Sequence, residues 1–423
     1  MNINEMYESN VRSYCRSFPV TFSKAKLDKL YTKDNVEYLD FFSGASALNY
    51  GHNNDAIIGD IIKYLQSDGI MHGLDMYTEA KEEFIKTFVD DILKPRNLEY
   101  KLMFCGPTGT NANEAALKIA RKHTKRQNVF AFMGAFHGMT MGSLALTSSL
   151  FDRGGAGTML NNVTFMPFPF REFEKIDTIA YMENILTDDH SGIEKPAAII
   201  LETVQAEGGV IVADAEWLRR LRKLCDDYDI LLIADEIQVG CGRTGTFFSF
   251  ERAGIVPDII TMSKSISGCG LPMSLLLMKP ELDCLKPGEH NGTFRGNQLA
   301  FVGAKAAIKY AIESDLWANV KEKGKIVDNY IEQEILTMYP KLKHRGIGLI
   351  HAIDFTEIRE GLSRLVSAEC FKHNLVIECS GRKGNSLKLL PALIISEKDL
   401  YDGLQIIKDA IITVLSQNGH KPM

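Results

Sequence analysis

The sequence predicts an α/β protein with a mostly parallel, seven-stranded sheet in a large domain, plus a smaller α+β domain from both termini. Between residues 100 and 280, seven short apolar runs alternate with helical patterns, which is typical of βαβ units. A chain of 423 residues is also too long for one ordinary core. The expected division is 1–54, an N-terminal segment and hairpin packing with the small domain; 55–315, the large domain; and 316–423, the small domain.

Composition excludes several classes of protein. Hydrophobic residues make up 45% and charged residues 24%, an ordinary balance for a globular protein. The net charge of -6, with acids and bases interspersed, gives no basic surface for nucleic acid. No apolar run approaches membrane-spanning length, and the first residues lack an apolar signal core. The eight cysteines show no C-x-x-C spacing, so we expect reduced thiols in a cytoplasmic protein and no metal site.

The N-terminal part is expected to begin with a short amphipathic helix over residues 1–15. Thr21–Phe42 alternates weakly around a turn signal at Lys33–Asn35, which predicts a β-hairpin. The glycine- and asparagine-rich stretch 43–54 is expected to be a loop. Two helices follow by apolar spacing, over residues 55–66 and 78–93.

The strands of the large domain are predicted from short runs rich in β-branched and aromatic residues. The candidates are Leu102–Cys105, Val129–Met133, Val163–Met166, Ala197–Leu201, Leu231–Ala234, Ile259–Met262 and Ser274–Met278. In the C-terminal part the pattern predicts helices over Ala300–Ile312, Leu316–Met338 and from Ser396 onward, with strands at Leu349–Asp354, Val376–Cys379 and Leu387–Leu389.

Two carboxylates and one amine follow neighbouring strand candidates. Asp235 and Glu236 end one apolar run, and Lys264 follows the next. Alone, such a lysine is usually solvated and such an aspartate usually caps a helix. Together they lie at the carboxyl ends of the strands, where open α/β sheets bind ligands. Pyridoxal 5'-phosphate chemistry needs such a pair: a lysine that forms a Schiff base with the cofactor, and an acid that keeps the pyridine nitrogen protonated.

The stretch DEIQVGCGRTG followed by SKSISGCGLP resembles the class III (ω-amino acid) aminotransferases, a branch of the fold-type I pyridoxal-phosphate enzymes. The resemblance runs along nearly the whole chain. It implies that Lys264 is the catalytic lysine and that Asp235, rather than Glu236, contacts the pyridine nitrogen. It also implies that Ile237 lies under the cofactor ring and Gln238 near its phenolic oxygen.

The phosphate site is expected at GPTGTNANEAALKIA, residues 106–120, where a strand leads into a helix. Free backbone N–H groups at a helix start suit a phosphate, although an ordinary helix start has the same pattern. The family match of TGTNANEA implies that Gly109 and Thr110 bind it.

Two further segments carry residues implied by the resemblance. Phe136 and His137 follow a strand; the alternative for such an aromatic residue is core packing, but the family places an aromatic ring on the cofactor opposite Ile237. HNGTFRGNQ resembles the segment whose threonine, Thr293 here, reaches the cofactor phosphate of another subunit. This implies a homodimer, or a dimer of dimers, with shared active sites.

A pair of residues is implied for substrate selection. ETVQAEGG matches a family motif whose glutamate, Glu207 here, pairs with a basic residue when an ω-amine binds and releases it when the α-carboxylate of glutamate arrives. Lys388 stands where the family has arginine, and lysine offers no bidentate fork. The alternative is that Lys388 is a surface lysine at a strand end.

Three features, RSFPVTF, ALNYGHNN with HGLDMYTEAK, and TFRGN with Lys388, are most similar to the diaminobutyrate–2-oxoglutarate aminotransferases of ectoine biosynthesis. They imply that L-glutamate aminates L-aspartate 4-semialdehyde, with no nucleic-acid or membrane partner. A 4-aminobutyrate transaminase, or a diaminobutyrate enzyme of siderophore or diaminopropane synthesis, stays open. Met139, where several relatives have arginine, counts against the first. A non-catalytic regulator with the same fold is a further alternative, and the presence of Lys264, Asp235 and Glu207 counts against it.

Overall fold

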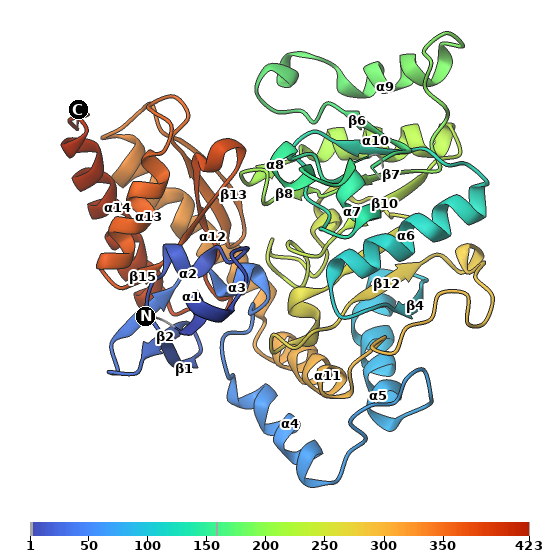
Figure 1. Ribbon diagram of the computed structural model, residues 1–423, viewed down its shortest axis with the longest axis horizontal. Helices are drawn as coiled ribbons and strands as arrows, with labels where there is room; N and C mark the ends of the chain where they lie inside the picture. Colours follow the sequence, from blue (N-terminus) through green and yellow to red (C-terminus); the bar gives the residue numbers. More distant parts are fainter. Residues whose placement is uncertain (1–2, 158–159, 423) are drawn as a thin grey trace.

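A seven-stranded sheet forms the centre of the larger part of the protein (Figure 1). The computed structural model describes residues 3–157 and 160–422. The strands of this sheet are β4 (Lys101–Phe104), β5 (Val129–Phe132), β6 (Val163–Met166), β7 (Ala198–Leu201), β10 (Leu231–Asp235), β11 (Ile259–Met262) and β12 (Leu275–Met278). Their order is β4-β12-β11-β10-β7-β5-β6, and β12 runs antiparallel to both its neighbours. The predicted α/β fold with a mostly parallel sheet is confirmed, and each predicted strand agrees to within one residue at either end.

The helices surround this sheet and the smaller part (Figure 1). They are α1 (Ile3–Tyr7), α2 (Tyr14–Ser17), α3 (Ser43–Ser46), α4 (Asp55–Gln66), α5 (Glu79–Thr87), α6 (Gly109–Thr124), α7 (Met141–Leu146), α8 (Leu150–Arg153), α9 (Thr178–Thr187), α10 (Ala215–Asp227), α11 (Gln298–Glu313), α12 (Leu316–Tyr330), α13 (Leu362–Lys372) and α14 (Glu397–Gln417). α5 and α12 each continue into a π-helical turn, Phe88–Leu93 and Ile331–Leu336, so the predicted longer helices are confirmed.

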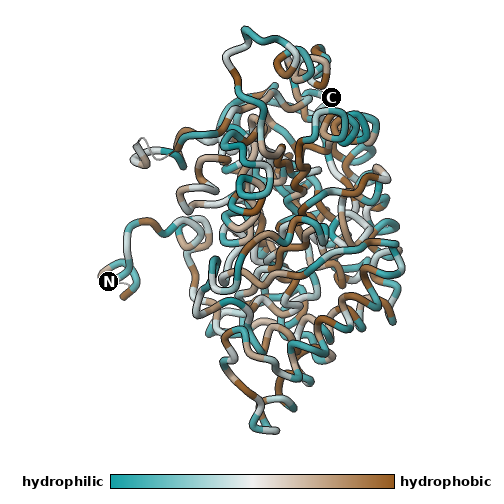
Figure 2. The backbone as a smooth tube through the Cα atoms, turned by 90° about the vertical axis from the view of Figure 1, so that its right-hand side faces the viewer, coloured by the Kyte–Doolittle hydropathy of each residue, from teal (hydrophilic) through white to brown (hydrophobic). Residues whose placement is uncertain are grey.

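The central strands are buried on both faces, which explains why they are continuously apolar. Alternate side chains of β10 enter two separate cores: Leu232 joins the core that contains Leu218 and Leu221 of α10, and Ile233 joins the core of the alanine-rich helix α6. This alternation follows from the two-residue period of a strand. Figure 2 shows that the hydrophobic segments gather inside the molecule.

Two four-stranded sheets build the smaller part. One has the order β13-β14-β17-β16 and consists of β13 (Lys343–Ile347), β14 (Ile350–Asp354), β16 (Glu378–Ser380) and β17 (Ser386–Leu389). The other has the order β1-β2-β3-β15 and consists of β1 (Phe22–Lys26), β2 (Lys29–Thr32), β3 (Glu37–Asp40) and β15 (Leu375–Val376). β3 pairs in parallel with β15, so the N-terminal strands join the C-terminal part. The exact domain limits remain a prediction.

Three local predictions were wrong. Residues 1–15 do not form one helix: α1 ends at Tyr7 and α2 begins at Tyr14, because the intervening serines and asparagine favour turns over helix. The turn of the predicted hairpin is confirmed between β2 and β3, but its first arm is not one strand: a second tight turn divides it into β1 and β2, which makes a three-stranded meander. Val376–Cys379 is divided between β15 and β16, which belong to different sheets.

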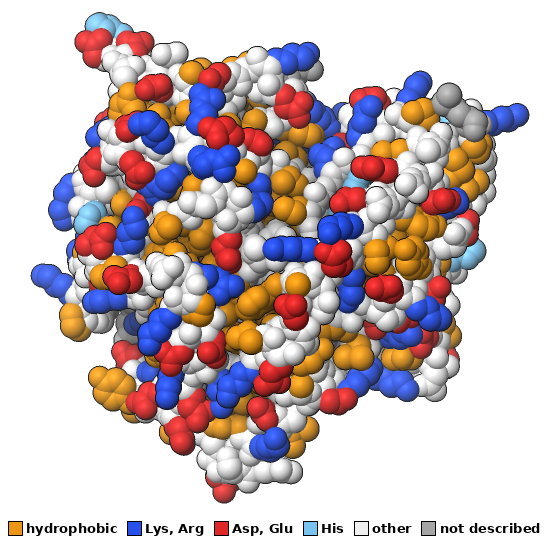
Figure 3. All heavy atoms as spheres, turned by 180° about the vertical axis from the view of Figure 1, so that it is seen from behind, with side chains coloured by type: hydrophobic (Ala, Val, Ile, Leu, Met, Phe, Trp, Pro, Cys, Tyr) orange, Lys and Arg blue, Asp and Glu red, His pale blue; other side chains and the backbone are white. Residues whose placement is uncertain are grey.

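The surface carries charges of both signs without a broad patch of either on the face seen in Figure 3. Within residues 3–157 and 160–422, no helix combines the length and the apolar character needed to cross a bilayer. The N-terminal segment leads away from the body of the molecule (Figure 2), and no residue of α1 is buried.

Candidate active site

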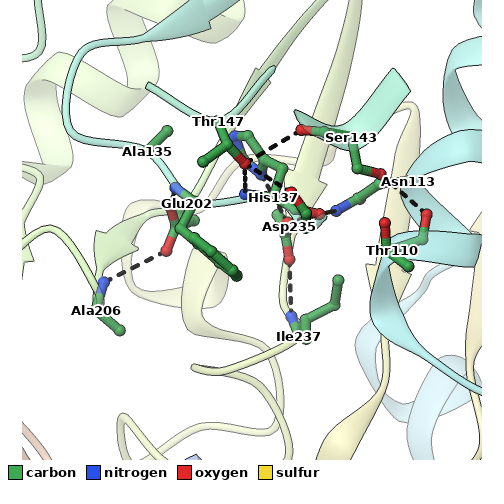
Figure 4. A network of polar contacts seen from close by, with 12 residues as sticks. Thr110, Asn113, Ala135, His137, Ser143, Thr147, Glu202, Ala206, Asp235 and Ile237 are labelled. Carbon is green, nitrogen blue, oxygen red and sulfur yellow. Dashed lines mark hydrogen bonds and ion pairs between the residues drawn. The ribbon is translucent and has the colours of Figure 1, made fainter. Parts of the chain in front are cut away.

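Asp235 ends strand β10 and lies at the centre of a buried polar network (Figure 4). Its Oδ2 atom accepts hydrogen bonds from His137 Nδ1 at 2.7 Å and from Asn113 Nδ2 at 2.9 Å. Its Oδ1 atom accepts from the backbone N–H of Ile237 at 3.1 Å. Burial alone lowers the pKa of the His137 ring, but the bond to Asp235 outweighs burial and raises it. Three donors therefore hold the Asp235 carboxylate in one orientation.

The neighbouring carboxylate, Glu236, points elsewhere. It accepts hydrogen bonds from the backbone N–H groups of Ser249 at 2.8 Å and Phe250 at 3.2 Å, and from the Ser249 hydroxyl at 2.7 Å. Burial raises the Glu236 pKa to about 7. Glu236 thus fastens the turn at residues 249–250, while Asp235 faces the network at the sheet edge.

Lys264 lies on the same edge of the sheet, just after β11. The parallel register places Asp235 opposite Thr261, three residues before the lysine. The backbone of Lys264 has φ +53°, a strained left-handed conformation for a residue with a side chain. Burial lowers the pKa of its amine, although Glu207 acts in the opposite direction. Within the part of the chain that the structure describes, no hydrogen bond or ion pair occupies this amine.

The N-terminus of α6 faces this edge. Gly109 is the first residue of the 16-residue helix, and the first N–H groups of a helix have no partner inside it. A Cβ atom on Gly109 would lie 2.7 Å from Ile237 Cδ1, so only glycine allows this close approach. The Thr110 hydroxyl lies 2.6 Å from that of Thr140. Helix start and Ile237 are thus in direct contact.

Phe136 is half-buried beside Glu202, a carboxylate that was not predicted as a site residue. The backbone N–H of Phe136 donates to Glu202 Oε1 at 2.9 Å, and the N–H of Ala206 donates to Oε2 at 3.4 Å. Burial raises the Glu202 pKa to about 7. Glu202 therefore links the loop of Phe136 and His137 to the segment that leads to Glu207 (Figure 4).

Lys388 is fully buried between two carboxylates, so it is not a surface lysine. Its Nζ atom lies 2.6 Å from Glu207 Oε1 and 2.9 Å from Glu378 Oε1. Burial opposes charge on all three groups. The Lys388 and Lys264 amines nevertheless outweigh burial at Glu207 and lower its pKa to about 2, whereas burial prevails at Glu378 and raises its pKa. For Lys388 the two carboxylates outweigh burial, and its pKa is raised.

Gln238 connects this ion-pair cluster to the sheet edge. Its side-chain nitrogen donates to Glu207 Oε1 at 3.1 Å and to the carbonyl of Ala45 at 3.1 Å. The loop of Ala45 is fixed by the buried Arg243, which donates to Ser46 Oγ at 3.0 Å. Burial lowers the pKa of Arg243 to about 9. The predicted loop 43–54 therefore lines the site, with one helical turn, α3, inside it.

Thr293 stands apart from the other predicted residues. It lies in an exposed loop, and within the described residues no hydrogen bond joins it to them. The structure therefore brings together Gly109, Thr110, Phe136, His137, Glu207, Asp235, Ile237, Gln238, Lys264 and Lys388, while Thr293 is on the outer surface of the chain.

The residues present fit pyridoxal 5'-phosphate on the chemistry of the donors. An amine without a partner, a fixed carboxylate and a helix N-terminus meet at one edge. Gln238 Oε1 and His137 Nε2 are buried without a hydrogen-bond partner, so polar groups are left for a ligand or water. Glu378 was not predicted as a site residue, although it lies directly opposite Lys388 in the pairing of β16 with β17. A single glutamate in an otherwise apolar strand candidate was the available signal.

Comparison with known proteins agrees with this geometry. The family model of class III aminotransferases matches residues 12–411. Diaminobutyrate–2-oxoglutarate transaminases from Wolinella succinogenes and Bordetella parapertussis are 54% and 51% identical to this chain. Each alignment covers 99% of this chain, with 97% and 96% of the respective relative.

Solved structures share the fold at lower identity. An ornithine aminotransferase from Toxoplasma gondii superposes with a TM-score of 0.86 at 23% identity, covering 98% of this chain and 94% of that protein. A transaminase from the marine bacterium Virgibacillus gives 0.88 at 19% identity, covering 99% of both. From the family match and the long, closely related alignments, the chain belongs to the class III aminotransferases, which are pyridoxal-phosphate-dependent enzymes of fold type I.

Proposed function

We propose that this enzyme transfers the amino group of L-glutamate to L-aspartate 4-semialdehyde, forming L-2,4-diaminobutyrate and 2-oxoglutarate, as a step of ectoine biosynthesis. The observation that carries this proposal is the buried cluster of Glu207, Lys388 and Glu378. The charges of this cluster act on the pKa of the Lys264 amine. The names of relatives about half identical to this chain support it.

Lys264 is proposed to move the proton during the reaction. Bound pyridoxal 5'-phosphate supplies an electron sink for the substrate's reacting carbon. A lysine amine acts as a base only when it is neutral, and burial, which lowers the Lys264 pKa, raises the neutral fraction. Lys264 would take the proton from the substrate carbon and return it on the cofactor side.

Asp235 and the start of α6 are proposed to hold the cofactor. The Asp235 carboxylate, fixed by His137 and Asn113, would pair with the pyridine nitrogen. Backbone N–H groups at Gly109 and Thr110 would bind the phosphate. Ile237 and Phe136 would contact the two faces of the ring, and Gln238 its phenolic oxygen.

Glu207 and Lys388 are proposed to let one pocket hold two kinds of substrate. L-Glutamate presents an α-carboxylate next to its reacting carbon, which Lys388 would bind. L-2,4-Diaminobutyrate reacts at its distal amine and presents only a methylene group there. In that state Glu207 would neutralise Lys388, because an unpaired buried charge is costly.

Glu378 is proposed to keep Lys388 in place throughout. When Glu207 moves aside for L-glutamate, Lys388 would lose its nearest carboxylate, at 2.6 Å, but keep Glu378 at 2.9 Å. A lysine has one compact charge, whereas an arginine presents a rigid fork. Glu378 would therefore hold the Lys388 amine in the orientation that, in relatives with arginine, follows from the rigid guanidinium group.

The assembly is proposed to be a homodimer or a dimer of dimers in the cytoplasm. Large apolar side chains are exposed near the N-terminus (Tyr7, Val11), in helix α8 (Phe151) and in the loop before α11 (Phe294), and such exposure is typical of protein interfaces. Thr293, beside Phe294, would then reach the cofactor phosphate of the partner. Eight free cysteines suit a reducing compartment.

The test is a panel of amino donors and aldehyde acceptors with purified holoenzyme. The proposal requires that L-glutamate with L-aspartate 4-semialdehyde gives the highest kcat/KM. A preference for succinate semialdehyde would indicate a 4-aminobutyrate transaminase instead. Deletion of the gene, followed by measurement of ectoine, separates ectoine synthesis from siderophore or diaminopropane synthesis.

A further inference from the structure

We propose that Asp328, His344 and His351 form a binding site for a divalent transition-metal ion of the zinc type, separate from the active site. The three residues come from three elements: α12, β13 and β14. Their spacing in the sequence carries no metal-binding motif, and the absence of paired cysteines predicted no metal. The fold brings their ligand atoms together.

The distances between the three ligand atoms match one face of a coordination tetrahedron. His344 Nε2 lies 3.0 Å from His351 Nδ1, and Asp328 Oδ1 lies 3.6 and 3.5 Å from these two nitrogens. Zinc binds histidine nitrogen and carboxylate oxygen at about 2.1 Å, which makes the edge of a tetrahedron about 3.4 Å. An ion placed against these atoms therefore reaches all three with little rearrangement. The fourth coordination position of the tetrahedron is then open.

A second contact orients one of the ligands. His351 Nε2 lies 2.7 Å from the carbonyl oxygen of Gly348, and a carbonyl accepts only from an N–H. The proton of His351 is therefore on Nε2, which leaves Nδ1 as an acceptor, 3.0 Å from His344 Nε2 and 3.5 Å from Asp328 Oδ1. A backbone carbonyl that fixes the ring in this way is the usual partner of a metal-binding histidine.

Three ligand atoms share a single ring proton in this cluster. His351 Nδ1 and Asp328 Oδ1 are both acceptors, 3.5 Å apart, and only a proton on His344 Nε2 lies between them. That N–H is within hydrogen-bond distance of His351 Nδ1, at 3.0 Å, whereas Asp328 Oδ1 lies 3.6 Å from the same nitrogen. A metal ion would satisfy all three atoms at once.

The surroundings allow entry of an ion. His351 is buried and His344 nearly so, while the side chain of Asp328 is 45% exposed. The open side faces a surface pocket lined by Phe170, Val212, Glu332 and Arg345, among others. Glu332 favours a cation there. Arg345 opposes it, but its charge is offset by Asp354 at 2.9 Å.

The metal would fasten the long helix α12 to the β13–β14 hairpin. β14 also pairs with β17, where Ala352 is opposite Lys388. The ion would therefore stabilise the sheet that carries the substrate-selecting lysine. Its role is structural, so the open position would hold water.

The experiment uses holoenzyme freed of metal by a chelator and then dialysed. Titration with zinc chloride is expected to show one tight site per chain and a rise in Tm. Cobalt(II) in the same site is expected to give d–d bands without the intense charge-transfer band of cysteine ligation. His344→Gln and Asp328→Asn should each weaken binding at least about tenfold. The matched control, His190→Gln, alters an exposed Asp–Asp–His group and should leave binding unchanged.

Three results would overturn the proposal. They are no zinc binding by the wild-type enzyme, binding that persists in both ligand variants, or binding that His190→Gln weakens as strongly. Tm values measured without metal show whether His344→Gln and Asp328→Asn are folded. If either unfolds, the other still decides, because Asp328 is half-exposed and contributes little to the core.

Discussion

Replacing Lys388 by methionine is expected to slow the reaction with L-glutamate far more than the reaction with L-2,4-diaminobutyrate. Methionine keeps most of the length of the side chain and removes its charge. The α-carboxylate of L-glutamate then loses a charged hydrogen bond, while L-2,4-diaminobutyrate presents no carboxylate at that point.

The size of the effect follows from the burial of Lys388. Its side chain is fully buried, so water does not replace the lost contact. A hydrogen bond to a charged group contributes about 1.5–3 kcal/mol, which corresponds to about 10- to 150-fold in kcat/KM. For L-2,4-diaminobutyrate we expect less than about threefold. Glu207 and Glu378 lose their shared cation in either case, so the difference between the two substrates isolates the contact with the α-carboxylate.

The assay follows each half-reaction of the holoenzyme separately, by the absorbance of the cofactor in single turnovers. Lys383→Met is the matched control, since Lys383 pairs with Glu360 on the surface and should change neither half-reaction. Equal losses in both half-reactions for Lys388→Met would show that the cluster does not select substrates. Glu378→Gln should reproduce a weaker form of the same asymmetry.

The other predictions concern cofactor, assembly and pH. Lys264→Ala should abolish turnover and the visible absorbance of the holoenzyme; near-wild-type turnover would contradict its role. Asp235→Asn should keep the fold but lower the rate at least about a hundredfold, typical of losing one electrostatic contact in the transition state; a larger loss in Glu236→Gln would reverse the two roles. Thr293→Ala should increase the release of cofactor on dialysis, and a fully active monomer in dilute solution would refute a shared site. Because the Glu207 pKa is lowered to about 2, its ion pair contributes fully above the ordinary value of 4.5 and is lost as pH falls toward 2. The Tm difference between wild type and Glu207→Gln should therefore narrow as the pH falls from 4.5 toward 2. A Tm difference that stays constant over this range would show that the charge of Glu207 does not stabilise the protein.

The large sheet could be predicted because each of its strands is a short run buried on both faces. β7, Ala198–Leu201, is fully buried, and no other element fits such a sequence between turns. The smaller sheets have mixed patterns, so β13 was not predicted: its lysine is exposed, and its polar histidine and arginine are largely covered. The hydrophobic pattern also cannot show where the chain leaves one sheet and enters another, as it does between Val376 and Glu378.

The site residues that could be predicted from the sequence are those whose place follows from the ends of the strands. Asp235 and Lys264 end adjacent strands, so their shared edge follows from strand order. Pattern did not distinguish Asp235 from Glu236, because the direction of each side chain depends on partners more than ten residues away, such as Ser249. Glu378 was missed for a related reason: its partner Lys388 is on another strand, and the pairing register brings them together.

The parallel pairing of β3 with β15 has a consequence for biosynthesis. Leu39 and Leu375 are partners, so the fourth strand of this sheet leaves the ribosome some 336 residues after the third. At about 5–20 residues per second, this interval lasts roughly 17–67 s. During that time the edge of β3 has no partner in its own chain and is open to pairing with other polypeptides. Nascent chains released before Leu375 are therefore expected to aggregate through their first strands and to depend on chaperones, even though the central sheet is already complete.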